Sequence, residues 1–263
     1  MARPGKRLQV RITVMLGNTD ADRRALEMLG QLTAETPAEI LGLFMEDIDL
    51  LTLADLPVAR EYCCLTHVER QLNAADIQRQ LRIQARSAER ALAAVAQRTG
   101  LSWSFQTVRG SLVSLLQDAA KEMDLMLLGA ARRTLPLPGH VSVTTLPRAS
   151  QPVSVIYDGS EASQRAFTVA LRLARIGQQA LDVFLMAAGN DDLASLREQT
   201  ERLAGPFALR FHELVNPAFE DILAAVRCQR AGTLVLGINE RLISPESIEL
   251  LRDRLRCPAI LVK

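Results

Sequence analysis

Two places in the sequence combine glycine with polar groups that could hold a small ligand. The first runs from Gly129 to His140 and includes Arg132, Arg133 and Gly139. Glycine lets backbone N–H groups approach an anion, and a guanidinium group can bind phosphate through two parallel hydrogen bonds. His140 could titrate near neutral pH or bind the ligand. The alternative is that the arginines are solvated loop charges and that His140 is a surface residue at a helix start.

The second place is formed by Asp158, Gly159 and Ser160, with Gly237 much later in the chain. The carboxylate of Asp158 could accept hydrogen bonds from a ligand. An aspartate before a glycine also commonly stabilises a turn through its own backbone, so the structural role stays open beside the binding role. These residues form a second candidate ligand site.

No metal site and no catalytic residue are predicted. On a helix, His67 would share a face with Cys63 and Cys64, but no fourth ligand lies nearby in the sequence, which favours a structural histidine beside buried thiols. The nucleophile elbow, the P-loop, the dinucleotide-binding glycine motif and the zinc-protease motif are all missing. The sequence therefore predicts a protein that binds rather than an enzyme.

Composition excludes several other classes of function. The 31 basic and 30 acidic residues leave a net charge of +1, so there is no general electrostatic attraction for nucleic acid or an anionic membrane. No apolar run approaches the length of about 20 residues that a membrane span requires. We therefore expect no nucleic-acid partner, no membrane insertion, and a cytoplasmic location with reduced cysteines.

The elements that must position the candidate residues occur twice, in the same order. A strand at 11–16 and another at 153–157 each lead through a polar turn into an amphipathic helix. The apolar stripes of these two helices are Ala25, Met28, Leu29 and Leu32 in the first copy, and Phe167, Ala170, Leu171 and Ala174 in the second. Downstream, short apolar runs at 125–129 and 233–237 each end in glycine, as buried parallel strands do. Further strands are expected at 39–45, 103–108, 181–187, 209–215 and 259–262, with Trp103 in the core.

Alternation of strands and helices predicts parallel sheets, whose ligands bind at the carboxyl ends of the strands. The turns that begin at Gly17, Gly129, Asp158 and Gly237 are all expected at that edge. Any ligand site is therefore expected there.

The chain resembles the universal stress protein family, in its tandem two-domain form. The resemblance rests mainly on residues 155–161, which are similar to the first strand and Asp-Gly-Ser-Glu turn of the family. Residues 124–129 are similar to its fourth strand, and residues 256–262 to its fifth. The resemblance implies two Rossmann-like, doubly wound α/β domains, at 1–150 and 151–263.

The resemblance also implies that each half has lost part of a nucleotide site. Nucleotide-binding members carry G-x2-G-x9-G-[S/T] after the fourth strand and an aspartate after the first. The first half keeps Gly129 and Gly139 but has Arg132 at the middle glycine and Gly17 in place of the aspartate. The second half keeps Asp158 but has no further glycine after Gly237. ATP binding is therefore expected to be weak or absent, and no cofactor is predicted beyond a weakly bound adenine nucleotide.

Two departures from the family pattern concern the first half. Residues 46–82 form an insert without a counterpart in the second half, expected to contain a short helix before Pro57 and to pack over the ligand edge or against the other domain. Residues 152–156 could serve as the fifth strand of the first half, but the Asp158 turn follows at once, so we assign them to the second half. The first half then has four strands and an edge that the second half or another chain should cover.

These observations predict a non-enzymatic, stress-type regulatory protein that acts by binding a small ligand or a partner protein, with a homo-oligomer such as a dimer as one form of partner. The alternative is a nucleotide-binding sensor with weak hydrolysis. A structural dimerisation module is the third possibility.

Overall fold

The computed structural model describes residues 10–16, 20–33, 37–63, 67–110, 113–115, 118, 122–129, 151–187, 189–238, 244–255 and 257–263. Its elements in the first half are β1 (Val10–Leu16), α1 (Asp20–Thr33), β2 (Ala38–Asp47), α2 (Ile48–Ala54), β3 (Arg60–Cys63), β4 (Val68–Gln71), α3 (Ala74–Thr99), β5 (Ser102–Gly110) and β6 (Leu125–Leu128). Those in the second half are β7 (Val153–Tyr157), α5 (Glu161–Gly177), β8 (Leu181–Ala187), α6 (Asn190–Ala204), β9 (Leu209–Val215), α7 (Phe219–Cys228), β10 (Thr233–Gly237), α8 (Pro245–Arg254) and β11 (Ala259–Val262).

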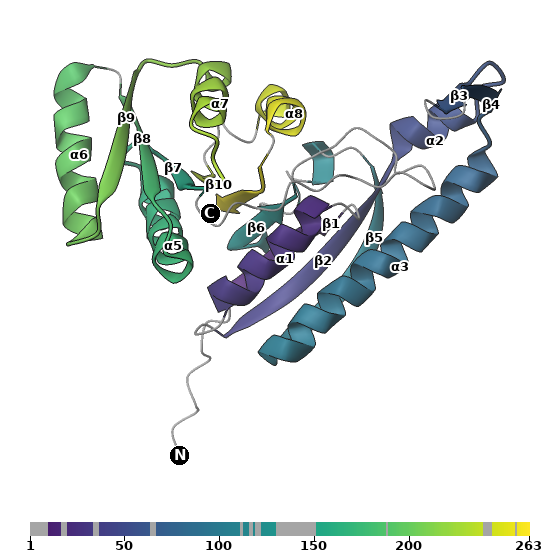
Figure 1. Ribbon diagram of the computed structural model, residues 1–263, viewed down its shortest axis with the longest axis horizontal. Helices are drawn as coiled ribbons and strands as arrows, with labels where there is room; N and C mark the ends of the chain where they lie inside the picture. Colours follow the sequence, from purple (N-terminus) through teal and green to yellow (C-terminus); the bar gives the residue numbers. More distant parts are fainter. Residues whose placement is uncertain are drawn as a thin grey trace.

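One nine-stranded sheet runs through both halves, in the order β5-β2-β1-β6-β11-β10-β7-β8-β9 (Figure 1). Among the described strands of this sheet, those of each half pair in parallel, and the β6–β11 pair at the joint is antiparallel. Reading outward from this joint, β6-β1-β2-β5 and β10-β7-β8-β9 repeat the same order. The predicted α/β class with parallel strands is confirmed.

The edge of β6 is covered by β11, so the joint lies inside the sheet. Strand β7 pairs with β8 and β10 and lies in the second half, and the described part of the first half contributes four strands to the large sheet. The division at residue 150 falls at the end of 130–150, which lie outside the described residues.

Helices cover both faces of the sheet, and each of the two cores contains residues of both halves. The first core unites α1 and α3 of the first half with α5 and α6 of the second. The predicted stripe of α5 is fully confirmed as buried, and that of α1 is buried except for Met28, which is partly exposed. Met28 instead reaches the other half, where the hydroxyl of Thr233 donates to its sulfur at 3.3 Å. The second core lies under α7 and α8.

The longest helix, α3, begins and ends where its local sequence dictates. The side chain of Asn73 accepts a hydrogen bond from the N–H of Ala75, and the chain leaves the helix at Gly100, with φ of 67°. A Cβ on Gly42 of β2 would lie 2.4 Å from a methyl carbon of Leu92, so glycine at this position lets α3 approach the sheet.

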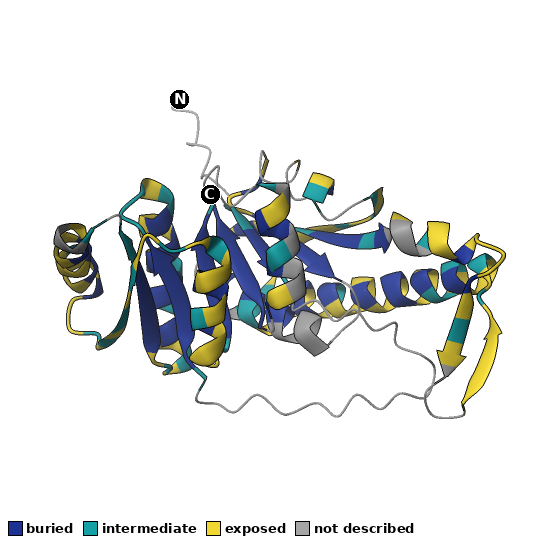
Figure 2. Ribbon diagram, turned by 90° about the horizontal axis from the view of Figure 1, so that it is seen from above, coloured by how far each residue is buried: buried dark blue, intermediate teal, exposed yellow. Residues whose placement is uncertain are grey.

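The insert forms α2 and the β3–β4 hairpin, and it begins at the carboxyl end of β2, but it does not lie against the other domain (Figure 1). The short helix before Pro57 is present, but its main contacts are with α3. Figure 1 places the hairpin at the end of the molecule farthest from α5 and α6, and Figure 2 shows it largely exposed. The prediction that the insert packs against the other domain was therefore wrong. Helix α3 extends past the sheet edge, and the insert at its start lies far from the second half (Figure 1).

Trp103 also departs from the expectation, with 37% of its surface exposed. It lies in β5, which is an edge strand of the large sheet and is only partly covered by α3. Alternation with Phe105 correctly indicated a strand, but alternation does not distinguish an edge strand from a central one.

Candidate functional site

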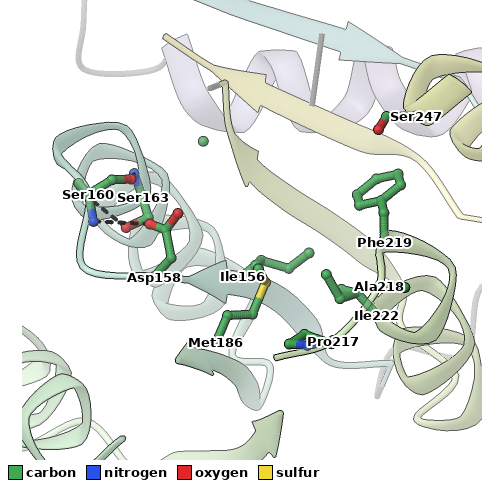
Figure 3. Close-up of a pocket in the computed structure, with 11 residues that line it drawn as sticks. Ile156, Asp158, Ser160, Ser163, Met186, Pro217, Ala218, Phe219, Ile222 and Ser247 are labelled. Carbon is green, nitrogen blue, oxygen red and sulfur yellow. Dashed lines mark hydrogen bonds between the residues drawn. The ribbon is translucent and has the colours of Figure 1, made fainter. Parts of the chain in front are cut away.

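A cavity of about 300 Å³ lies at the carboxyl ends of the second-half strands (Figure 3). Strands β7, β8 and β10 contribute its floor, and the first turns of α5, α7 and α8 contribute its walls. The lining residues are Ile156, Asp158, Ser160, Ser163, Met186, Pro217, Ala218, Phe219, Ile222, Gly237 and Ser247. Three of the four second-half candidates, Asp158, Ser160 and Gly237, therefore line one cavity.

The two sides of this cavity differ in chemistry. Figure 3 shows Asp158, Ser160 and Ser163 together on one side, with Phe219 and Ile222 on the opposite side. This separation suits a ligand with one apolar surface and one hydrogen-bonding edge. Sequence reasoning missed the apolar wall, because the helical spacing of Phe219 and Ile222 indicates a buried helix face but does not show that the face borders a cavity.

The Asp158 turn is built by local hydrogen bonds. Asp158 Oδ1 accepts from the N–H of Ser160 at 3.0 Å, and Gly159 has φ of 80°, where a side chain would be strained. Ser160 Oγ caps α5 by accepting from the N–H of Ser163 at 3.2 Å. Asp158 thus has the turn role and also lines the cavity, so the turn role does not exclude the binding role.

The charge of Asp158 is stabilised by the same turn. Burial by itself raises the pKa of this carboxyl, but hydrogen bonds from Ser160 and Ser163 outweigh it and bring the pKa below its ordinary value of 3.8. Burial, followed by the nearby charge of Asp158, raises the pKa of Tyr157. The cavity therefore contains a carboxylate that is ionised at neutral pH.

We predict that this carboxylate makes the stability of the folded protein fall at acidic pH. Because its folded-state pKa is lowered, its stabilisation is present above the unfolded-state value of 3.8 and is lost as pH falls through the folded-state value. Between about pH 6 and about pH 3, the urea midpoint of the wild type should fall further than that of Asp158→Asn. The asparagine keeps an acceptor for Ser160 but does not titrate, so equal falls in the two proteins would contradict this assignment.

Gly237 lines the cavity and also controls how closely β10 approaches α5. A Cβ at this position would lie 2.5 Å from the carbonyl carbon of Ala162 and 2.6 Å from the nitrogen of Ser163. The close neighbours are backbone atoms of the first turn of α5, which cannot rotate aside. Gly237 therefore holds the capped start of α5, with the Asp158 turn, against the sheet.

The first-half candidates cannot be assembled into a site. Gly129 lies at the carboxyl end of β6, whereas Arg132, Arg133, Gly139 and His140 lie outside the described residues. Because β6 and β11 are antiparallel, the strands of the two halves end at opposite edges of the joined sheet. The turns at Gly129, Asp158 and Gly237 follow the carboxyl ends of their strands, as expected, whereas Gly17 lies outside the described residues. Because the two halves use opposite edges of the joined sheet, their incomplete sites do not combine.

The arrangement considered for a metal is not formed by a helix. Cys63 ends β3, and His67 lies in the hairpin turn with φ of 53°, where its Nδ1 is 2.7 Å from the hydroxyl of Tyr62. Cys64 lies outside the described residues. Over the part of the chain that is described, three or more histidine, cysteine or acidic side chains nowhere gather as a metal site would require. Nor does that part contain a helix long and apolar enough to span a membrane.

Comparison with known proteins gives matches in structure but not in sequence. No protein-family model and no curated protein sequence matches the chain. A universal stress protein from Archaeoglobus fulgidus aligns with 96% of this chain and 98% of its own, at 17% identity and a TM-score of 0.53. A functionally unknown protein from Pseudomonas aeruginosa aligns with 98% of this chain and 93% of its own, at 12% identity and a TM-score of 0.52. A universal stress protein in complex with cAMP covers 43% of this chain and 96% of its own, at 23% identity and a TM-score of 0.36.

Proposed function

The chain has the fold of the universal stress proteins, and from this premise we propose that it is a non-enzymatic regulatory protein whose second-half cavity binds a small ligand. The observation that carries the proposal is the cavity itself, which has a volume of about 300 Å³. The ionised Asp158 lies on one side of it and an apolar wall on the other. Ligands of open parallel sheets bind at this edge, outside the carboxyl ends of the strands.

The chemistry of the lining supports binding over catalysis. Among the described lining residues, the polar side chains are one carboxylate and three serines. Ser160 accepts from the N–H of Ser163, and the hydroxyl of Ser163 donates to the carbonyl of Ser160 at 2.9 Å. These hydroxyls hold the helix start, and no histidine or lysine of the described lining is placed to activate one as a nucleophile.

A nucleotide sensor is the second candidate, supported by the position of Asp158 after the first strand of its half. The volume of the cavity lies at the low end of the range of roughly 300–1,000 Å³ that is typical of small-molecule sites. A nucleoside-sized ring system suits this space better than a triphosphate. We therefore retain adenine compounds as ligands to test, and we expect ATP to bind weakly or not at all.

The regulatory output would pass through a partner protein or a second copy of the chain. Several large apolar side chains of the insert are exposed, among them Leu53, Leu56, Val58, Tyr62 and Val68. An exposed apolar surface of this kind is typical of an interaction site. Substitutions in the insert are thus the first that should be tested for loss of binding to a partner.

The proposal can be tested by mass spectrometry of small molecules released from the purified protein. Ala218→Trp would fill the cavity from the start of α7, whereas Leu203→Trp adds the same side chain at a half-exposed position of α6. We expect the wild type and Leu203→Trp to release the same bound compound and Ala218→Trp to release none. Release of that compound by Ala218→Trp, or no bound compound in the wild type, would contradict the proposal.

A further inference from the structure

We infer that the cavity selects a ring compound that is uncharged or cationic and carries N–H donors, and that it rejects the phosphate ester of the same compound. The inference rests on the proposed function and specifies the ligand class of that site. It is carried by the three helix starts that line the cavity, because at each of them the chain itself occupies backbone donors that a phosphate could use.

At the start of α5, two backbone donors are taken. The N–H of Ser160 donates to the carboxylate of Asp158 at 3.0 Å, and the N–H of Ser163 donates to Ser160 Oγ at 3.2 Å. Helix starts bind phosphate through such N–H groups together with the positive end of the helix dipole. At α5 a carboxylate of the protein stands where a phosphate oxygen would otherwise bind.

The start of α7 repeats this arrangement with a second carboxylate. The N–H of Ala218 donates to Oδ2 of Asp221 at 3.1 Å, and Ala218 lines the cavity. The first turn of α7 also contains Glu220, which pairs with Arg254 at 3.0 Å. An incoming phosphate would have to displace Asp221 from a donor and then remain near its charge.

The start of α8 is capped by a hydroxyl. The N–H of Ser247 donates to Ser244 Oγ at 3.2 Å, and the Ser244 and Ser247 hydroxyl oxygens lie 2.9 Å apart. Each of the three helix starts at the cavity therefore has an internal acceptor, and two of these acceptors are carboxylates.

Charge within the cavity acts in the same direction. Asp158 is the one ionisable side chain among the described lining residues, and none of those residues is a lysine or an arginine. Like charges repel most strongly where solvent is partly excluded, so a dianionic phosphate beside Asp158 is disfavoured. An amino or amidine group of a ligand would instead donate to this carboxylate.

The apolar side fixes the remaining character of the ligand. Ile156 and Met186 come from the sheet, and Phe219 and Ile222 come from α7. A flat ring placed among these side chains would bury its faces, while one edge would point toward Asp158. This combination describes a planar, nitrogen-bearing ring such as that of a nucleoside or an aromatic amine.

The test is calorimetric titration of the full chain with matched pairs of compounds. The probes are adenosine, cytidine, guanosine and pyridoxamine, each compared with its own 5′-phosphate ester. We expect at least one parent compound to bind and its ester to bind at least tenfold more weakly. Higher salt should narrow this difference, because it screens the repulsion.

Two variants separate charge from shape. Asp158→Asn and Asp221→Asn each keep an acceptor for the helix start but remove one negative charge. Each should therefore narrow the difference in affinity between the parent compound and its phosphate ester. Glu89→Gln removes an equal charge from an exposed position of α3 in the first half and should leave the difference unchanged.

The possible outcomes separate this inference from the proposed function. The proposed ligand class would be overturned by an ester that binds as tightly as its parent, or by a difference in affinity that Asp158→Asn and Asp221→Asn leave unchanged. Either result would still be consistent with a ligand site in this cavity. Absence of binding by every probe of both kinds would overturn the ligand class, and the proposed function would then depend on the compound released from the purified protein.

Discussion

Gly237→Ala should destabilise the protein by about 3 kcal/mol, because overpacking against atoms that cannot move costs about 1–3 kcal/mol and occasionally more. The added methyl group would lie within 2.7 Å of three backbone atoms of Ala162 and Ser163. The first turn of α5 must then move away from β10 and take the Asp158 turn with it. Urea denaturation should show the loss of stability, and the bound compound should be lost at temperatures where the variant is still folded.

Gly30→Ala is the matched control for this substitution. Gly30 lies in α1, and a Cβ there would meet no atom within 4 Å. Alanine is a better helix former than glycine by about 0.8–1 kcal/mol, so this variant should be as stable as the wild type or slightly more stable. A Gly237→Ala protein with wild-type stability would show that β10 and α5 are not held at the distance described here.

Ile260→Ala should destabilise both halves together, by about 2–5 kcal/mol. Ile260 is fully buried in β11, opposite Leu127 of β6 at the antiparallel joint. Both residues belong to the core that runs from α1 and α3 to α5 and α6, so the cavity left by alanine weakens packing in each half. The chain should therefore unfold in one transition that occurs at lower urea concentration than in the wild type.

The single tryptophan makes this prediction specific. Trp103 lies in β5 of the first half, so its fluorescence reports on that half, whereas Ile260 belongs to the second half. We expect the fluorescence transition to move with the transition seen by far-ultraviolet circular dichroism. Leu203→Ala, at a half-exposed position of α6, should move neither transition appreciably. A fluorescence midpoint unchanged by Ile260→Ala would mean that the halves unfold independently.

The elements were largely predictable, because each leaves a local periodic signal. The stripe of Phe167, Ala170, Leu171 and Ala174 indicated α5, and the apolar run at 233–237 indicated β10. The Asp158 turn was predictable for the same reason, since an Asp-Gly-Ser sequence between a strand and a helix has few conformations available. Three of the cavity residues were therefore identified from the sequence.

The remaining features depend on contacts between distant residues, which local patterns do not record. Nothing in β6 or β11 alone indicates that the two strands pair in antiparallel, yet this pairing puts the two carboxyl edges on opposite sides. The segment from Cys63 to His67 was considered as a helix, although it belongs to the β3–β4 hairpin. Two side chains four residues apart can come close together either on a helix or across a tight hairpin. The apolar wall formed by Met186 and Phe219 exists only because β8 and α7 meet at the cavity.

Hydrogen–deuterium exchange tests the central claim most directly, by comparing the protein as purified with protein from which small molecules have been stripped. A ligand in the second-half cavity should slow exchange in peptides that contain Ser160, Ser163 and Phe219, where α5 and α7 begin. Peptides from α3, in the first half, should exchange at the same rate in both samples. Slower exchange confined to the first half, or equal exchange throughout, would contradict a ligand site at Asp158.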